Sequence, residues 1–405
     1  MMSNNNTKQY FAIFILLLAI LISFGLTAKF NINVAHSFES INAQQQVSSQ
    51  NDINYSTILD TLQYNRSIHV LLMLLAGFGF LMVVIRGHGF QAITATYLMV
   101  SLAIPLYILI KSFGGEHFAM DAINIKTLLF AEFAAASLLI AIGAPLGRLS
   151  MDQYLVLGLM FIPAYIFNEW LILESGLFKG LLDTGGSIAI HAFGAYFGLG
   201  VITNKMHKYK TNTAWHSDDT SNVFSLLGSV LLWVFWPSFT SAIVEPQLVV
   251  LTAFNTIFAL CGSTLATYVV SKILRGKVGI EDIANASLAG GVAIGSICSS
   301  TTIGFAMFVG IMAGILSTVG YNIISPKLEK LIKGVDSCGI NNLHGMPGIL
   351  GGVVAAFITG NFAIQIGGIV TTVVVAYIAG NIAGKVMSLC NNKKQIYCHE
   401  DEFVG

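Results

Sequence analysis

Charged residues are scarce in this chain. Of its 405 residues, 10% are Asp, Glu, Lys or Arg, whereas 55% are hydrophobic, and the mean hydropathy is +0.75. A water-soluble domain of this length needs more charge at its surface, so the composition excludes that class and indicates an integral membrane protein in a lipid bilayer. The 20 basic and 20 acidic residues balance, so no nucleic-acid partner is predicted.

Cysteines are few, and the common catalytic motifs are missing. The 5 cysteines lie in apolar segments or near basic loops, a pattern that predicts no disulfide framework. The sequence contains no His-Glu-x-x-His, Gly-x-Ser-x-Gly, Walker or Gly-x-Gly-x-x-Gly motif. These motifs mark zinc hydrolases, serine esterases and nucleotide sites. We therefore expect neither an enzyme nor a bound cofactor or metal.

What the chain does have is a series of long apolar stretches. Crossing a bilayer takes about 20 helical residues. With the N-terminus inside, 15 of the 20 Lys and Arg residues fall in predicted cytoplasmic segments, as the positive-inside rule requires. The twelve predicted spans cover residues 10–28, 66–86, 91–110, 124–147, 152–175, 186–204, 222–243, 247–271, 284–300, 302–324, 345–360 and 363–388.

These spans divide the chain into four parts. Residues 1–28 fit either a membrane span or a cleaved signal peptide, and both interpretations stay open. Residues 29–65 are predicted as an extracellular loop, in which Asn54 and Asn65 begin glycosylation triplets whose use stays open. Residues 66–390 form the transmembrane domain, and residues 391–405 form a cytoplasmic tail. The expected location is the plasma membrane, or the inner membrane in a bacterium.

Two polar sequences in this apolar chain share one frame. Each has an acid, a histidine eight residues later and a glycine seven residues after the histidine. Five predicted spans separate the two copies, so the helices that carry them run in opposite directions, as in inverted repeats that build a site at the membrane midplane. The copies are Asp183-Thr-Gly-Gly-Ser-Ile-Ala-Ile-His191 with Gly198, and Asp336-Ser-Cys-Gly-Ile-Asn-Asn-Leu-His344 with Gly351.

The frame also sets the depth of the histidines. Eight helical residues rise about 12 Å, which carries each imidazole toward the centre of a hydrocarbon core about 30 Å thick. Polar groups at that depth are costly and usually face a cavity or a partner, so His191 and His344 are predicted to share one site. Two neutral rings suit a small neutral molecule. Asp183 and Asp336 are interpreted as helix-end supports.

Longer motifs around these frames resemble the ammonium transporter/Rhesus (Amt/Rh) family, on its Rh glycoprotein branch. They occur along the chain in the expected order, up to the eleventh span. The motifs are Asn168-Glu-Trp170, Asp183 to Gly198, Trp233-Val-Phe-Trp-Pro-Ser-Phe239, Asn285-Ala-Ser-Leu-Ala-Gly-Gly291 and Asp336-Ser-Cys-Gly-Ile-Asn-Asn-Leu-His-Gly-Met-Pro-Gly348.

The resemblance implies a fold and a set of site residues. The fold is an all-α channel of eleven helices with inverted five-helix repeats, plus the extra N-terminal span or signal peptide, assembled as a homotrimer with a pore in each subunit. Amt proteins carry a serine four residues after the second gate phenylalanine, where this chain has Ile243, which implies weaker binding of NH₄⁺ at the outer mouth. The implied site residues are the pore pair His191 and His344, the stacked outer gate Phe133 and Phe239, the vestibule acid Glu169, and the acids Asp183 and Asp336.

The function that this resemblance implies is passage of ammonia. Ammonium would lose its proton at the outer gate and cross as NH₃, exchanging hydrogen bonds with the two histidines. The species that crosses overall stays open between NH₃, NH₃ with a separate proton, and NH₄⁺. One alternative is a CO₂ channel through the same apolar pore. The other is a scaffold or ammonium sensor without transport, which the intact histidines and gate phenylalanines disfavour.

Overall fold

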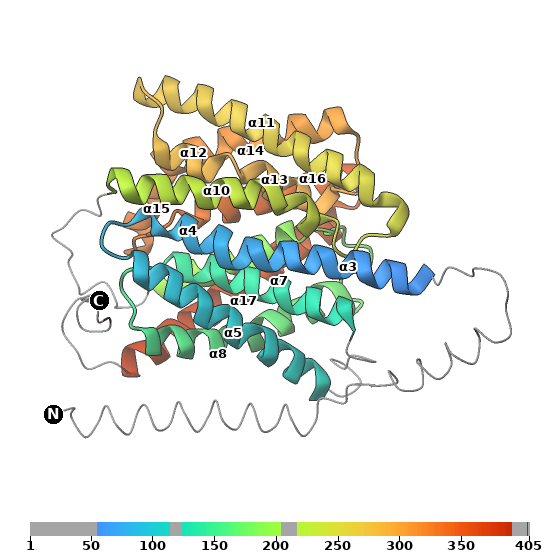
Figure 1. The fold of residues 1–405 in the computed structure, drawn as a ribbon, viewed down its shortest axis with the longest axis horizontal. Helices are drawn as coiled ribbons and strands as arrows, with labels where there is room; N and C mark the ends of the chain where they lie inside the picture. The colour runs from blue at the N-terminus through green and yellow to red at the C-terminus, as the bar shows by residue number, and fades with distance from the viewer. Residues whose placement is uncertain (1–54, 114–123, 204–216, 391–402, 404–405) are drawn as a thin grey trace, which may run out of the picture.

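The computed structural model describes residues 55–113, 124–203, 217–390 and 403, and every regular element in this part of the chain is helical. The long helices lie roughly parallel along the longest axis of the molecule (Figure 1). The predicted span at 1–28, Asn54 and nearly all of the predicted tail lie outside the described residues. Asn65 lies on a helix rather than in the predicted loop, because α3 already begins at Tyr55.

The chain forms α-helices that are interrupted by short π and 3-10 turns. The elements are α3 (Tyr55–Leu72), η1 (Met73–Phe78), α4 (Gly79–Leu81), η2 (Met82–Val84), α5 (Gly89–Phe113), α7 (Ile125–Gly143), α8 (Met151–Glu169), η3 (Trp170–Glu174), η4 (Ser187–Ala192), α9 (Phe193–Ile202), α10 (Asp219–Thr240), η6 (Pro246–Leu248), α11 (Val249–Arg275), α12 (Ile280–Ala286), α13 (Ala289–Ile294), η7 (Gly295–Ile297), α14 (Ile303–Val319), η8 (Gly320–Ile324), α15 (Ser325–Ile332), η9 (Asn341–Gly345), α16 (Met346–Thr359) and α17 (Phe362–Cys390).

The predicted spans after residue 66 correspond to these elements with one difference. In the described part of the chain, 9 helices are long and apolar enough to cross a membrane, and the segment Ser187–Ile202 is a shorter apolar helix. The span predicted at 284–300 is divided among the end of α12, α13 and η7, instead of forming one helix. Within this segment α13 packs closely on α11, because a Cβ on Gly290 would overlap the carbonyl of Ala259.

Side chains at the helix starts explain where several helices begin. Asn124, Ser150 and Asp218 each accept a hydrogen bond from the backbone N–H three residues later, and the residue at that later position bonds back to the first N–H. Such capping boxes satisfy N–H groups that a helix leaves free at its start, which matters in a bilayer because lipid offers no partner.

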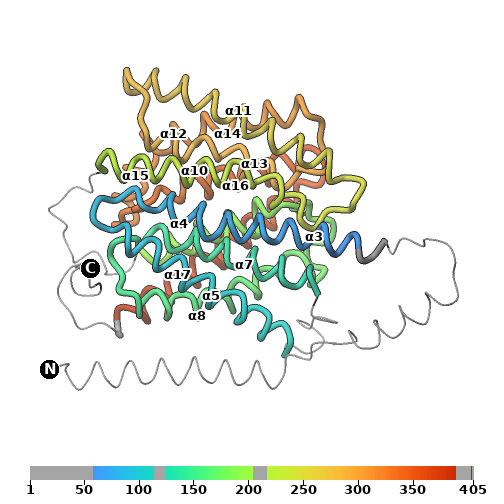
Figure 2. The backbone as a smooth tube through the Cα atoms, in the orientation of Figure 1, coloured from blue at the N-terminus to red at the C-terminus, as the bar shows by residue number. Residues whose placement is uncertain are grey.

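Helices from the two ends of the sequence pack against each other. α17 packs on α8 and α9, and α16 packs on η4. Figure 2 shows the C-terminal α17 lying among helices of the first half of the chain, whereas α11 and α14 lie together at the opposite edge. This interlocking brings the two acid-to-histidine frames, 153 residues apart, into contact.

A candidate substrate pore

Five aromatic and imidazole rings from five elements form a column through the centre of the bundle. Phe133 of α7 and Phe239 of α10 have ring centroids 4.8 Å apart. Phe239 lies 6.0 Å from His191, which lies 5.3 Å from His344, and His344 stacks at 6.1 Å on Phe78. The four ring residues predicted from the sequence therefore meet in one continuous series, which we call the ring column.

The two histidines are joined by a hydrogen bond. Their rings are nearly parallel, at 8°, and the Nδ1 atoms lie 3.2 Å apart. Both residues are buried, with 1% and 3% of their surface exposed. When both rings are neutral, one Nδ1 must donate its hydrogen and the other must accept it, so the Nε2 atoms have the opposite roles. The pair then offers one Nε2 acceptor and one Nε2–H donor.

Each histidine lies in a π-helical turn that follows a carboxylate cap. His191 belongs to η4 and His344 to η9. The Asp183 carboxylate accepts hydrogen bonds from the N–H groups of Ile188 and Ala189, at 2.8 to 3.1 Å. The two aspartates thus hold the free N–H groups at the helix starts, which is the position where a negative charge is favoured.

The second frame repeats this geometry. The two oxygens of Asp336 accept from the N–H groups of Ile340 and Asn341, at 3.0 and 2.9 Å. Burial raises the pKa of the Asp183 and Asp336 carboxyls, and these backbone hydrogen bonds oppose that rise.

The first frame is also fastened to the divided segment at 284–300. The Ser187 hydroxyl donates to the carbonyl of Val292 at 2.6 Å and accepts from the N–H of Ser296 at 2.7 Å. The N–H of Gly185 donates to the carbonyl of Gly295 at 2.8 Å. The break in the predicted span thus exposes backbone groups that the start of η4 uses, so the irregular segment supports the helix that carries His191.

The Phe133 end of the ring column is closed by aromatic contact. Phe133 and Phe239 are both buried, and their rings are inclined at 56°. Phe130 packs edge-on against Phe133 at 6.2 Å. Rings this close are in van der Waals contact, so a molecule that follows the column must displace one of them.

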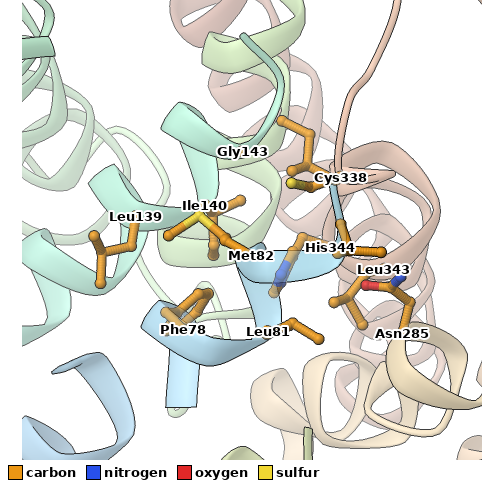
Figure 3. A pocket seen from close by; sticks show the side chains of 12 residues that line it. Phe78, Leu81, Met82, Leu139, Ile140, Gly143, Asn285, Cys338, Leu343 and His344 are labelled. Atoms are coloured by element: carbon orange, nitrogen blue, oxygen red, sulfur yellow. The ribbon is translucent and has the colours of Figure 1, made fainter. Parts of the chain in front are cut away.

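The other end opens into a mostly apolar cavity. Its walls come from η1, α4 and η2, from α7, and from the segment that leads into η9 (Figure 3). His344 points into it, and Phe78, Leu81, Met82, Leu139 and Ile140 contribute apolar side chains. The lining is thus largely apolar, with Asn285 and Cys338 as further polar side chains beside His344.

Glu169 lies in a separate cluster of charges, between α8 and α5. The residue is 4% exposed, and its carboxylate accepts a hydrogen bond from the Tyr107 hydroxyl at 2.7 Å and lies 3.6 Å from the Lys111 ammonium. Lys111 also pairs with Glu174 at 2.9 Å. Glu169 is thus a paired, buried carboxylate, and its role as an acid of the external vestibule, which the resemblance implies, stays a prediction.

Two members of the site were not identified from the sequence. Trp236 stacks on His191 at 5.6 Å and 20°, and Phe78 covers His344 from the other side. Trp236 stands three residues before Phe239, a spacing that puts both on one face of α10, so the helical period could have identified it. Phe78 lies in a π turn of an apolar span, and no local pattern separates it from lipid-facing phenylalanines.

Known proteins match this chain over most of its length. Residues 13–395 match the Ammonium Transporter Family. The ammonium transporter Rh type B of Danio rerio is 35% identical over 357 residues, which cover 84% of this chain and 74% of that protein. The Rh type B transporter of Oryzias latipes is 35% identical over 372 residues, which cover 87% of this chain and 76% of that protein.

Solved structures match the fold as well. Rh50 of Nitrosomonas europaea, described with the Rhesus protein family of channels, superposes with a TM-score of 0.83 and 48% identity over 87% of this chain and 93% of that one. A structure described as a sensor Amt protein gives a TM-score of 0.73 at 16% identity, over 85% of this chain and 96% of that one, and so shares the fold.

Proposed function

Because the chain belongs to the ammonium transporter family, on its Rh-type branch, we propose that the ring column is the path by which ammonia crosses the membrane. The family transports rather than catalyses. The observation that carries the proposal is the buried His191–His344 pair, whose Nδ1 atoms are 3.2 Å apart directly behind the aromatic contact of Phe133 and Phe239.

The chemistry of the imidazole pair fits NH₃. The nitrogen lone pair of ammonia accepts from the free Nε2–H of one ring, and an N–H of ammonia donates to the free Nε2 of the other. His191 Nε2 is buried and has no hydrogen-bond partner among the described residues. A buried nitrogen without a hydrogen-bond partner favours a polar molecule bound beside it, because that molecule's hydrogen bond offsets the free-energy cost of removing the nitrogen from water.

The walls of the path select against charge. Apolar groups of Phe78, Leu81 and Leu139 border the exit from His344. A bare cation in such surroundings costs several kcal/mol. We therefore propose that ammonium gives its proton to water on the outer side of the contact between Phe133 and Phe239, and that NH₃ crosses.

The acidic cluster near the outer end has a part in this proposal. Glu169 and Glu174 share the single cation Lys111, and Glu174 places a carboxylate charge at the exposed edge of this site. Glu174 is the more exposed of the two acids, with 42% of its side chain accessible. Such a charge raises the local concentration of cations. We assign the attraction to the pair, with Glu174 at its exposed edge.

The assembly and placement follow the family. We propose a homotrimer with one pore per subunit in the plasma membrane, or the inner membrane in a bacterium, with residues 66–390 as the channel domain and residues 391–405 in the cytoplasm.

The test is ammonia flux into proteoliposomes of the purified protein. Stopped-flow measurement of internal pH after an ammonium pulse should show fast alkalinisation, which His191→Ala and His344→Ala change by about two- to tenfold, the effect expected for one hydrogen bond. Unchanged flux in both variants at equal incorporation refutes the proposal. An opposing CO₂ gradient tests the alternative substrate, and electrical recording of the same liposomes shows whether charge accompanies the transfer.

A further inference from the structure

Helix α3 contacts both helices that carry the aromatic contact of the ring column, each at the residue just before the phenylalanine. The Ser67 hydroxyl donates to Glu132 Oε1 at 2.6 Å, and Glu132 precedes Phe133 on α7. His69 Nδ1 lies 2.9 Å from Ser238 Oγ, and Ser238 precedes Phe239 on α10. The two contacts leave α3 only two residues apart.

The contact with α7 is a single buried hydrogen bond. Ser67 is 1% and Glu132 0% exposed. The other carboxyl oxygen, Glu132 Oε2, has no hydrogen-bond partner among the described residues. A carboxyl group in an apolar interior depends strongly on each hydrogen bond that it makes. Ser67 therefore sets the position of Glu132, and with it the turn of α7 that carries Phe133.

The contact with α10 falls beside the proline near the end of that helix. Pro237 has no N–H, so the carbonyl of Trp233 loses its helical hydrogen bond, and α10 ends at Thr240. His69 contacts α10 on both sides of Pro237, through Ser238 in the last turn and through ring contact with Phe235 in the turn before it, at 5.2 Å. Side-chain contacts here replace part of the missing backbone support.

We infer that Ser67 and His69 are positioning residues that set the separation of the Phe133 and Phe239 rings, and thereby the size of amine that passes. This inference rests on the proposed function, because it requires the two rings to act as the gate. Neither residue belongs to the ring column. Each acts through the backbone neighbour of a gate phenylalanine, and both act from one rigid helix.

The experiment compares methylammonium with ammonia flux in proteoliposomes. Ser67→Ala and His69→Ala should each raise the ratio of methylammonium to ammonia flux by about two- to tenfold, because a ring that is less restrained admits the added methyl group. His69→Gln and Ser67→Thr, which keep a hydrogen-bonding group, should restore much of the original ratio. If His69→Ala fails to fold, Ser238→Ala removes the same hydrogen bond with a smaller change.

Ser225→Ala is the matched control. Ser225 lies on α10, and its hydroxyl donates to the Leu81 carbonyl at 3.1 Å. The alanine variant therefore removes a buried hydroxyl contact of the same helix at a position away from the gate. Its flux ratio should match that of the unchanged protein. If Ser225→Ala changed the flux ratio as much as His69→Ala does, any weakening of α10 would change the ratio. That result would overturn the inference.

A double-mutant cycle with Phe239→Ala separates the inference from the function on which it rests. If His69 acts through the gate ring, His69→Ala should have no further effect on the ratio once Phe239 is alanine. A Phe239→Ala variant with an unchanged ratio refutes the gate itself. The positioning role alone is refuted by a different pair of results. In that case Phe239→Ala raises the ratio of methylammonium to ammonia flux, whereas Ser67→Ala and His69→Ala leave it unchanged.

Discussion

Gly291→Ala should damage the site through Trp236 without touching a pore histidine. A Cβ at position 291 would lie 2.6 Å from Trp236 Cε2, with two more indole atoms at 2.7 and 2.8 Å. Trp236 is fully buried, so the ring has no free space to enter and must shift against its neighbours. Overpacking of this kind costs about 1–3 kcal/mol of stability.

The same shift reaches the pore. Trp236 stacks on His191 at 5.6 Å, and an aromatic stack contributes about 0.5–1.5 kcal/mol beyond its buried area. Losing it should lower ammonia flux by about two- to tenfold, since 1.4 kcal/mol corresponds to a factor of ten. The assays are thermal unfolding of the purified protein in detergent and stopped-flow flux in liposomes.

Gly304→Ala is the control for this prediction. Gly304 is exposed in the first turn of α14, and a Cβ there would meet nothing within 4 Å. This variant should be unchanged or slightly more stable, because alanine is the better helix former. In a Trp236→Phe background the cost of Gly291→Ala should shrink. The reasoning is refuted if Gly291→Ala matches Gly304→Ala in both stability and flux.

Two further variants test the buried polar contacts. Lys111→Met leaves the Glu169 carboxylate buried with no cation beside it and should lower the free energy of unfolding by about 3–5 kcal/mol. Lys111→Met combined with Glu169→Gln should recover most of that loss. Equal losses of stability in the single and the double variant would contradict this reasoning. Ser187→Ala removes the hydroxyl that joins the Val292 carbonyl and the Ser296 amide, so chemical unfolding should show a loss of about 1–3 kcal/mol, and no change would mean that the segment holds without it.

The sequence predicts the centre of this site well, because the centre is built from a repeated frame. Asp183 with His191 and Asp336 with His344 share their spacing, and the odd number of spans between them requires opposite helix directions. Helix rise alone then brings the two imidazoles to one depth, and the structure shows them in contact at 3.2 Å. The Amt/Rh membership that the motifs indicated is confirmed by the family match.

What the sequence did not predict depends on packing between distant segments. The π turns around His191 and His344 add a residue to a helical turn, at places where Ser187 and Asp336 hold the backbone. No local sequence pattern predicts these π turns. The pairing of Glu169 with Lys111 joins residues on different helices, so their sequence separation hides it. The division of span 284–300 accompanies hydrogen bonds from its backbone to Gly185 and Ser187, which lie about 100 residues earlier in the chain.

The hydrogen bond between His191 and His344 has a consequence for symmetry. The two frames make the backbone of the site almost two-fold, yet a neutral pair holds only one proton between its Nδ1 atoms, so the rings cannot be chemically equivalent. The ring column therefore has a chemical asymmetry that its backbone lacks, because one ring presents an Nε2–H donor and the other an Nε2 acceptor. The neighbours of the two rings differ as well, with Trp236 against His191 and Phe78 against His344.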